Sequence, residues 1–400
     1  MFAKLADSKP VRAGWWSTVI LFLVHGLVVS TWVSRIPAVQ SALRLPNGVL
    51  GLTLLSSAVG ALLTIPFSGF LVSRYGSKKI SATSSLLFCP SVILPGLAFN
   101  AATLSIALLV FGAVAAAMDV SMNAQGVEVE KALGTPTMSR FHAMFSLGGM
   151  IGAGLGGLAA AHGVKVLPHF AASSALNMMA VAIVCPFLLD THQAGSQAGH
   201  RLPFSKIPRV LFALSAIGFC ILLSEGAMGD WTAVYLKQVL RAGAGTAAAG
   251  YAVFSASMAI FRFLGDMITA RLGPLLTVRT GSLVAAGGLL WALAMHSPGW
   301  SLPGFAAAGA GFSVIIPLVF GSGGRVDSVS PGAGIATVTG IGYIGFIVGP
   351  PAIGFASQLV TLRYALGIVV ACCFTSALFA ESMRSLGAGR VDETAAEIHF

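Results

Sequence analysis

Long apolar runs fill most of this 400-residue chain. Each of twelve segments holds about 20 mostly apolar residues, which is the length a helix needs to cross roughly 30 Å of hydrocarbon. Backbone groups in hydrocarbon must satisfy their own hydrogen bonds, and runs rich in Ala, Leu and Gly do so as helices rather than as barrel strands. The sequence therefore predicts an all-α membrane protein with twelve transmembrane helices. The expected ranges are 14–34, 47–71, 80–99, 102–126, 141–162, 167–189, 210–235, 247–266, 279–297, 302–323, 334–358 and 364–383.

Charged residues are scarce, at 9% of the chain against roughly a quarter in soluble domains. This excludes a disordered chain, a disulfide scaffold, a nucleic-acid binder and almost any cytosolic enzyme. The net charge of +10 does not indicate a nucleic-acid partner, because the Lys and Arg residues are scattered over the short loops. No metal, cofactor or catalytic site is predicted, since the five cysteines all lie in apolar segments without ligand spacing. They are Cys89, Cys185, Cys220, Cys372 and Cys373.

The distribution of basic residues predicts the orientation. If the N-terminus is cytoplasmic, 17 of the 23 Lys and Arg residues fall in inner segments and 6 in outer loops. This bias places both termini in the cytoplasm. The predicted organisation is an N-terminal cytoplasmic tail, a six-helix bundle, a polar cytoplasmic linker, a second six-helix bundle and a C-terminal cytoplasmic tail. Their ranges are 1–13, 14–189, 190–209, 210–383 and 384–400.

The two halves of the chain contain an internal repeat. At an offset of 197 residues Arg74 aligns with Arg271 and Gly76 with Gly273. Four more glycine pairs coincide: Gly126 with Gly323, Gly148 with Gly345, Gly152 with Gly349, and Gly157 with Gly354. A same-direction repeat of six spans predicts two pseudo-symmetric bundles with a substrate site between them.

One loop carries a recognisable motif. The stretch Gly69-Phe-Leu-Val-Ser73-Arg74-Tyr-Gly76-Ser-Lys78-Lys79 resembles the cytoplasmic loop motif of the major facilitator superfamily, with Ser73 where that motif has Asp. The later loop, from Gly265-Asp266 to Arg271-Leu-Gly273, is similar to a degenerate copy of it. The resemblance implies the major facilitator fold, no enzymatic activity, and gating roles for Arg74, Asp266 and Arg271.

Three further stretches resemble the MosC-like branch of that superfamily. They are Asp119–Glu128 leading into Ser139–His142, Glu225–Trp231, and Gly342–Pro351. The resemblance implies a multi-pass transporter of the bacterial inner membrane that works as a monomer in the lipid bilayer.

Three acidic residues are expected inside the spans, where a charged group is costly and therefore a functional candidate. Glu225 lies about 22 Å along its helix from the cytoplasmic edge, in an apolar stretch. Low-polarity surroundings favour a protonated carboxyl group, which suits a proton carrier. The alternative is a hydrogen-bonded Glu that only holds helices together. Asp230 is expected at the outer boundary, as a substrate or outer-gate residue.

Asp119 and Asn123 are four residues apart and share a helix face. They are predicted to form a proton or substrate site, the alternative being a gate contact between Asp119 and Arg140. His25 lies near the midplane and is a candidate for a substrate hydrogen bond or a proton relay, or for plain packing. Arg140 and the neighbouring His142 are expected to act in gating.

Three aromatic residues, Trp32, Trp231 and Tyr343, are candidates for stacking on a ring-shaped substrate. The alternative for both tryptophans is a place in the interfacial belt. Arg262 is expected at the inner end of its helix, with its side chain reaching toward the interface. The glycines of span five, Gly148, Gly152 and Gly156, are expected to allow close helix packing.

These observations favour a proton-coupled secondary transporter, such as a symporter, that works by alternating access. Acids and few fixed positive charges favour a small polar solute, neutral or cationic, such as a sugar, polyol or amino-sugar-like molecule. A multidrug/proton antiporter that exports apolar cations is the alternative, because Met and Phe are abundant. A membrane sensor or enzyme is disfavoured by the absence of any such motif.

Overall fold

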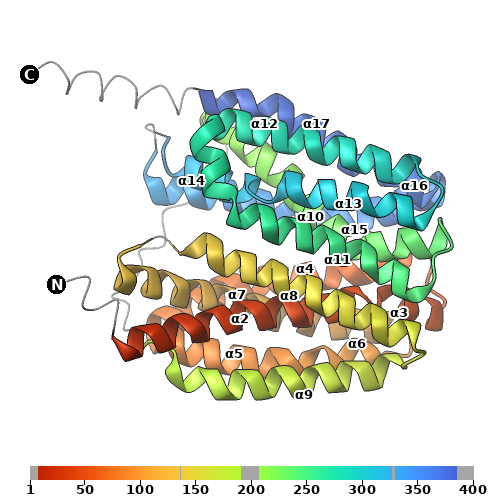
Figure 1. Cartoon of the computed structure of the whole chain (residues 1–400), viewed down its shortest axis with the longest axis horizontal. Helices are drawn as coiled ribbons and strands as arrows, with labels where there is room; N and C mark the ends of the chain where they lie inside the picture. The colour runs from red at the N-terminus through yellow and green to blue at the C-terminus, as the bar shows by residue number, and fades with distance from the viewer. Residues whose placement is uncertain (1–7, 136, 191–206, 327–328, 385–400) are drawn as a thin grey trace, which may run out of the picture.

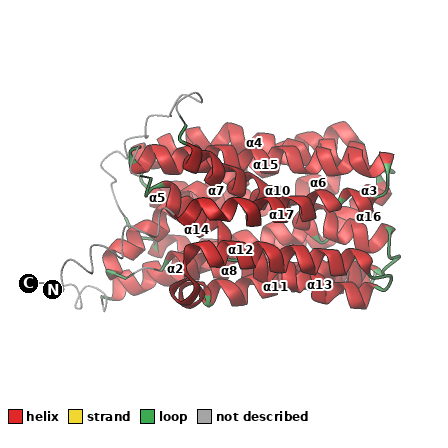
Figure 2. Ribbon diagram, turned by 90° about the horizontal axis from the view of Figure 1, so that it is seen from above, coloured by secondary structure: helices red, strands yellow, loops and turns green. Residues whose placement is uncertain are grey.

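The computed structural model describes residues 8–135, 137–190, 207–326 and 329–384. Every regular element in these ranges is a helix, and the long helices run along one common direction (Figure 2). Twelve helical segments there are long and apolar enough to cross a membrane, and each overlaps one predicted span. The prediction of an all-α chain with twelve spans is confirmed.

The first six spans form one bundle, drawn in red to yellow-green in the lower half of Figure 1. Its helices are α2 (Lys9–Val33), α3 (Ile36–Ala42), α4 (Asn47–Tyr75), α5 (Ser77–Ser91), α6 (Ile93–Leu97), α7 (Ala101–Leu133), α8 (Met138–Ala161), α9 (Val166–Val184) and the 3₁₀ turn η1 (Cys185–Phe187).

The last six spans form the second bundle, drawn in green to blue in the upper half of Figure 1. Its helices are α10 (Arg209–Gln238), α11 (Ala244–Phe263), α12 (Gly265–Ala294), α13 (Pro298–Phe312), α14 (Ile315–Gly323), α15 (Pro331–Leu359), α16 (Leu362–Ala365), α17 (Gly367–Phe379) and the 3₁₀ turn η3 (Ala380–Met383).

The described chain starts and finishes at one end of the molecule, on the left in Figure 1. We call this the Lys9 end, and we call the opposite end, where α3 finishes, the Ala42 end. Most of the predicted tails and linker, namely residues 1–7, 191–206 and 385–400, lies outside the described residues.

The largest difference from the predicted spans occurs in the ninth. Helix α12 begins at Gly265 rather than at residue 279, so Asp266 and Arg271 lie on a helical segment and not in a loop. This helix contains Gly273 at φ 74° and ψ 163°, where two helical segments meet at a kink. The sequence pattern missed the first segment because it is short and polar.

The internal repeat is visible in the backbone. Gly76 has φ 85° and its repeat partner Gly273 has φ 74°, a conformation that only glycine adopts without strain. At the same offset Arg44 and Arg241 have φ 53° and 54°. The chain thus makes the same unusual turns twice, which confirms the predicted duplication of a six-helix unit.

Repeated glycines also make the same helix contacts in each bundle. A Cβ atom on Gly148 of α8 would stand 2.1 Å from the Leu23 carbonyl oxygen of α2. A Cβ atom on Gly345 of α15 would stand 2.3 Å from the Phe219 carbonyl oxygen of α10. Small residues therefore let these helix pairs approach through their backbones, as expected for helix packing in membranes.

We expect Gly148→Ala to destabilise the protein by about 1–3 kcal/mol, because the new methyl group overlaps backbone rather than a movable side chain. The matched control is Gly154→Ala on the same helix, where a Cβ atom meets nothing within 4 Å. Thermal unfolding of the purified variants in lipid nanodiscs measures both effects. Equal unfolding temperatures for the two variants would contradict the close-packing argument.

Candidate functional site

A cavity of about 340 Å³ lies between the two bundles. Four helices of the first bundle line it (α2, α4, α7 and α8), and three of the second (α10, α11 and α15). Its wall carries three carboxylic acids, several aromatic rings and three serines. The acids are Asp119, Glu225 and Asp230; the aromatic residues include Trp32, Phe145, Tyr251, Tyr343 and Phe346; the serines are Ser57, Ser146 and Ser255.

The cavity brings together six of the eight residues predicted for substrate and proton binding: His25, Trp32, Asp119, Glu225, Asp230 and Tyr343. The remaining two, Asn123 and Trp231, are not part of its wall. Because these six residues come from both halves of the chain, the structure supports their placement around a common space. Their roles stay predictions.

Glu225 of α10 faces a buried cation. Its Oε2 atom lies 3.8 Å from Nη2 of Arg262 on α11, and the two side chains are 17% and 11% exposed. The other carboxylate oxygen, Oε1, is buried without a hydrogen-bond partner among the described residues. An unpaired buried oxygen of this kind is costly unless water or a solute reaches it.

Arg262 does not extend toward the membrane interface as the sequence suggested. Its guanidinium turns inward and donates hydrogen bonds to Ser146 Oγ at 2.7 Å and to the Ser313 carbonyl oxygen at 3.2 Å. The sequence missed this residue because its helical position indicated the span end, while its acceptors belong to other parts of the chain. A basic residue within an otherwise apolar segment was the one available signal.

Asp119 of α7 is bonded to its own helix. Asn123 Nδ2 donates to Asp119 Oδ1 at 3.1 Å and to the Asp119 carbonyl oxygen at 2.8 Å. The alternative contact with Arg140 is not made, since Arg140 is exposed and forms no ion pair in the described part of the chain. Asn123 therefore orients the carboxylate from behind the cavity wall.

Asp230 lies on α10, where this helix passes from the cavity wall toward the packed interior. Within the described ranges the Asp230 side chain makes no hydrogen bond or ion pair, so its carboxylate remains available to the contents of the cavity. In the same ranges no three His, Cys, Asp or Glu side chains come together as ligands for a metal ion.

His25 of α2 is 7% exposed and sits between two rings, with centroids 5.0 Å from Phe88 and 5.4 Å from Phe145. Neither ring nitrogen has a hydrogen-bond partner in the part of the chain that the structure describes. His25 also lines the cavity, although both of its ring nitrogens are buried in this conformation. Packing alone would leave two buried polar atoms unsatisfied.

The two tryptophans are not interfacial. Trp32 is 4% exposed, and its ring centroid lies 6.5 Å from that of Phe170. The residue also lines the cavity. Trp231 is fully buried, and its indole nitrogen has no partner among the described residues. The belt interpretation is wrong for both, because neighbouring helices enclose this part of α2 and α10.

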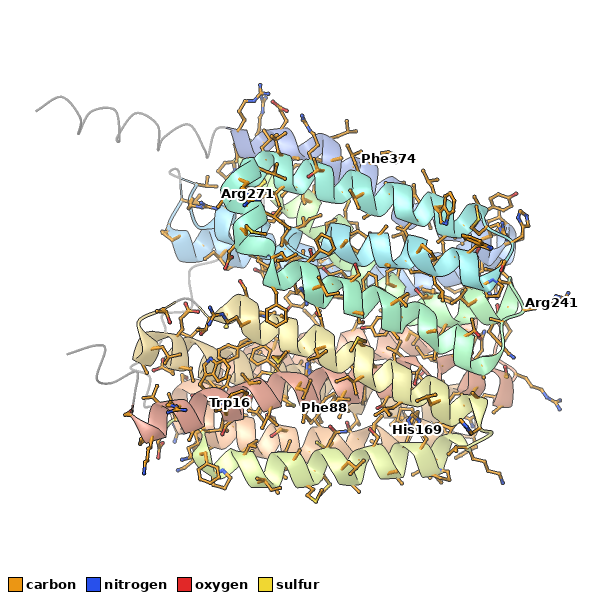
Figure 3. The ribbon with its side chains drawn as sticks, viewed as in Figure 1. Trp16, Phe88, His169, Arg241, Arg271 and Phe374 are labelled. Atoms are coloured by element: carbon orange, nitrogen blue, oxygen red, sulfur yellow. The ribbon has the colours of Figure 1, made fainter. Side chains whose placement is uncertain are left out.

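The residues predicted to act in gating are not part of the cavity wall, although the His142 carbonyl oxygen accepts a hydrogen bond from Arg262 beside it. Arg74, Asp266 and Arg271 are exposed at the Lys9 end, and Arg271 can be compared with Arg241 at the opposite end in Figure 3. The Arg74 guanidinium lies 5.6 Å from the Tyr75 ring centroid. The His142 ring packs edge-on against Phe22 at 5.3 Å. Their gating roles stay predictions.

Two seams of small residues join the two bundles toward the Ala42 end. Between α8 and α11, a Cβ atom on Gly157 would stand 3.1 Å from the Ala248 Cβ atom and 3.1 Å from the Gly245 carbonyl oxygen. Between α15 and α4, a Cβ atom on Gly354 would stand 2.7 Å from the Asn47 carbonyl oxygen. Gly157 and Gly354 are repeat partners, so the two seams are related by the duplication.

An amide cluster also joins the two bundles at this end, linking α3, α4 and α10. Gln238 Nε2 donates to Gln40 Oε1 at 3.0 Å and to Asn47 Oδ1 at 3.2 Å, and Gln40 Nε2 donates to the same Asn47 oxygen at 2.8 Å. No feature of the sequence alone pairs Gln238 with the other two amides, because they are nearly 200 positions apart.

Comparison with known proteins agrees with this architecture. The family model of the Major Facilitator Superfamily matches residues 15–327. The chain is 34% identical to an uncharacterised MFS-type transporter of Yersinia pestis, over 92% of this chain and 95% of that protein. It is 31% identical to the membrane protein MosC of Rhizobium meliloti, over 88% and 87% of the two chains.

The crystal structure of a mutant of the nucleoside transporter NupG has the same fold, with a TM-score of 0.72 at 12% identity and coverage of 93% and 99%. The chain is a multi-pass membrane protein that belongs to the major facilitator superfamily of transporters.

Proposed function

We propose that this transporter moves a small polar organic solute, neutral or cationic, across the bacterial inner membrane by alternating access coupled to protons. The solute class is a sugar, polyol or amino-sugar-like molecule. The observation that carries the proposal is the cavity between the bundles, whose wall holds three acids and, among the described residues, no Lys or Arg. We expect both termini to lie in the cytoplasm, because most Lys and Arg residues fall in the segments predicted to be on that side. One monomer suffices, because a single chain builds the whole cavity.

The charge of the wall supports a neutral or cationic solute. Arg262 lies behind the wall and compensates Glu225, while Asp119 and Asp230 have no cation at ion-pair distance in the described ranges. An anionic solute would meet these carboxylates at short range in a space of low polarity, where repulsion is strong. Hydroxyl and ammonium groups would instead donate hydrogen bonds to them.

NupG is a nucleoside transporter, and it shares only the fold with this chain. Aromatic rings near the acids, such as Trp32 and Tyr343, suit a solute with one flat or apolar face. A purely apolar cation would leave the Asp230 carboxylate without a hydrogen-bond donor. The wall therefore favours a polar solute over the drug-export alternative.

We expect sugars, inositols or small amines to stabilise the purified protein in a thermal-shift screen. A solute present at about 100 times its Kd should raise the unfolding free energy by about 2.7 kcal/mol. Apolar cationic drugs and phosphorylated sugars serve as comparison sets. Stabilisation by the drugs alone would support multidrug export instead, and stabilisation by phosphorylated sugars alone would contradict the charge argument.

We expect Glu225→Gln to abolish uptake of the identified solute that is driven by a pH gradient in proteoliposomes, because an amide cannot carry a proton. Exchange of labelled for unlabelled solute should continue, since it needs no net proton transfer. The matched control is Glu381→Gln, which removes an acid paired with Arg279 at 2.5 Å, away from the cavity. Unchanged gradient-driven uptake in Glu225→Gln would remove this residue from the coupling step.

We expect His25→Phe to keep or raise the unfolding temperature while weakening solute binding by about tenfold or more, because the imidazole has no partner inside the described protein. Gln125→Leu is the contrasting variant. Its amide nitrogen donates to Ser77 Oγ at 2.9 Å and to the Leu189 carbonyl oxygen at 2.8 Å, so its loss should cost about 1–3 kcal/mol. A large loss of stability in His25→Phe with unchanged binding would show that His25 is a packing residue.

A further inference from the structure

The Arg262 guanidinium connects the two bundles at the cavity. On the first-bundle side it donates to Ser146 Oγ at 2.7 Å and to the His142 carbonyl oxygen at 3.4 Å, both on α8. On its own side it donates to the Ser313 carbonyl oxygen at 3.2 Å and faces Glu225 of α10 at 3.8 Å. One side chain thus ties α11 to α8 across the boundary between the bundles.

The α4–α15 seam has no such arginine at the position that corresponds to Arg262 in the internal repeat. The α4–α15 seam is the repeat partner of the α8–α11 seam, and both share the same glycine contacts at the Ala42 end. At the offset of 197 residues, the partners of Arg262 and Ser146 are Ile65 and Tyr343. Both line the cavity, and the aliphatic side chain of Ile65 has no group that could donate a hydrogen bond. The two seams are therefore chemically different where they pass the cavity.

Glu225 is the one acid at ion-pair distance from Arg262 among the described residues. The remaining acceptors of the guanidinium are neutral oxygens, which compensate its charge only in part. Removing one partner of a buried ion pair leaves an uncompensated charge, which strongly destabilises the arrangement. The α8–α11 tie consequently depends on the charge of a carboxyl group that belongs to a third helix.

Other titratable groups surround Glu225 from each neighbouring element. Helix α17 turns its thiols toward Cys220 and Ser224 rather than toward Glu225. The groups that face the carboxyl, its partner Arg262 or the cavity are Arg262 and Tyr251 on α11, Tyr343 on α15, Asp230 on α10, His25 on α2, Asp119 on α7 and His142 on α8. Arg262 is the charged group at ion-pair distance.

We propose that Arg262 is a positioning residue that fastens α8 to α11, and that neutralising Glu225 releases this fastening. A proton on Glu225, or a cationic group of a solute bound to it, withdraws the countercharge from the guanidinium. The hydrogen bonds to Ser146 and His142 then weaken, and the α8–α11 seam opens beside the cavity. The inference rests on the proposed function in that the cavity is a transport site, and it adds the step that links Glu225 to helix movement.

Hydrogen–deuterium exchange of the full chain in lipid nanodiscs tests this without any solute or gradient. The readout is amide protection in peptides covering 138–150 of α8 and 255–264 of α11. We expect Glu225→Gln and Ser146→Ala to raise exchange there about threefold or more, as for loss of a hydrogen bond to a charged group. Arg279→Gln and Glu381→Gln, which break an ion pair within the second bundle, are the matched controls and should leave these peptides unchanged.

The pH profile separates the proposed link from a purely structural role. After correction for intrinsic exchange, the wild-type seam should lose protection as pH falls, whereas Glu225→Gln should be insensitive to pH. The double variant Glu225→Gln/Arg262→Gln should match Arg262→Gln alone, because Glu225 acts through Arg262. If Arg262→Gln does not fold, Ser146→Ala and the pH profile still decide the question.

Unaltered protection of the seam in Glu225→Gln, or equal pH dependence in both proteins, would overturn the inference. Glu225→Gln could lose gradient-driven uptake while amide protection of the α8–α11 seam stays unaltered. The proposed function would then stand, and only the role of Arg262 in it would be contradicted. A seam that responds as expected in a protein without proton-driven uptake would support the link between Glu225 and Arg262 and contradict the proposed coupling to protons.

Discussion

Hydrocarbon offers no hydrogen bonds, and this constraint decides where every polar group of the chain can lie. Backbone amides are satisfied within helices, and large apolar side chains such as Leu63 and Leu378 cover the outer surface, at 69% and 76% exposed. Acids and arginines inside the spans are tolerated where protein or water can compensate them. The boundary between the bundles is one place that provides such compensation, and Asp119, Glu225 and Arg262 all lie there.

Because the chain is duplicated, the same spacing of glycines occurs in both bundles and forms both seams of that boundary. Gly148 and Gly345 bring one helix pair together within each bundle, and Gly157 and Gly354 bring the bundles together at the Ala42 end. These contacts leave little or no room for a side chain, and they recur at the same offset. The repeated unit therefore specifies both the internal packing of each bundle and the surface by which it meets its partner.

The twelve spans, the duplication and six residues of the cavity wall, the three acids among them, could be predicted, because hydropathy, fixed offsets and acids in apolar runs are local signals. Contacts between distant helices could not. The inward turn of Arg262 depends on acceptors on α8 and α10, and burial of Trp231 depends on which helices enclose α10. The early start of α12 was missed because a glycine at positive φ joins two segments that hydropathy separates.

Compensation of charge in the cavity is unequal, and this difference suits the three acids to different tasks in the proposed transport cycle. Glu225 has a fixed cation at 3.8 Å, Asp119 has the neutral amide of Asn123, and Asp230 has neither within the described ranges. A carboxylate without a fixed partner is stabilised by whatever occupies the cavity, so Asp230 and Asp119 suit contact with a solute. A carboxylate with a fixed partner affects that partner when it loses its charge. Glu225 is therefore the acid whose state the surrounding helices can sense, since Arg262 holds two of them together.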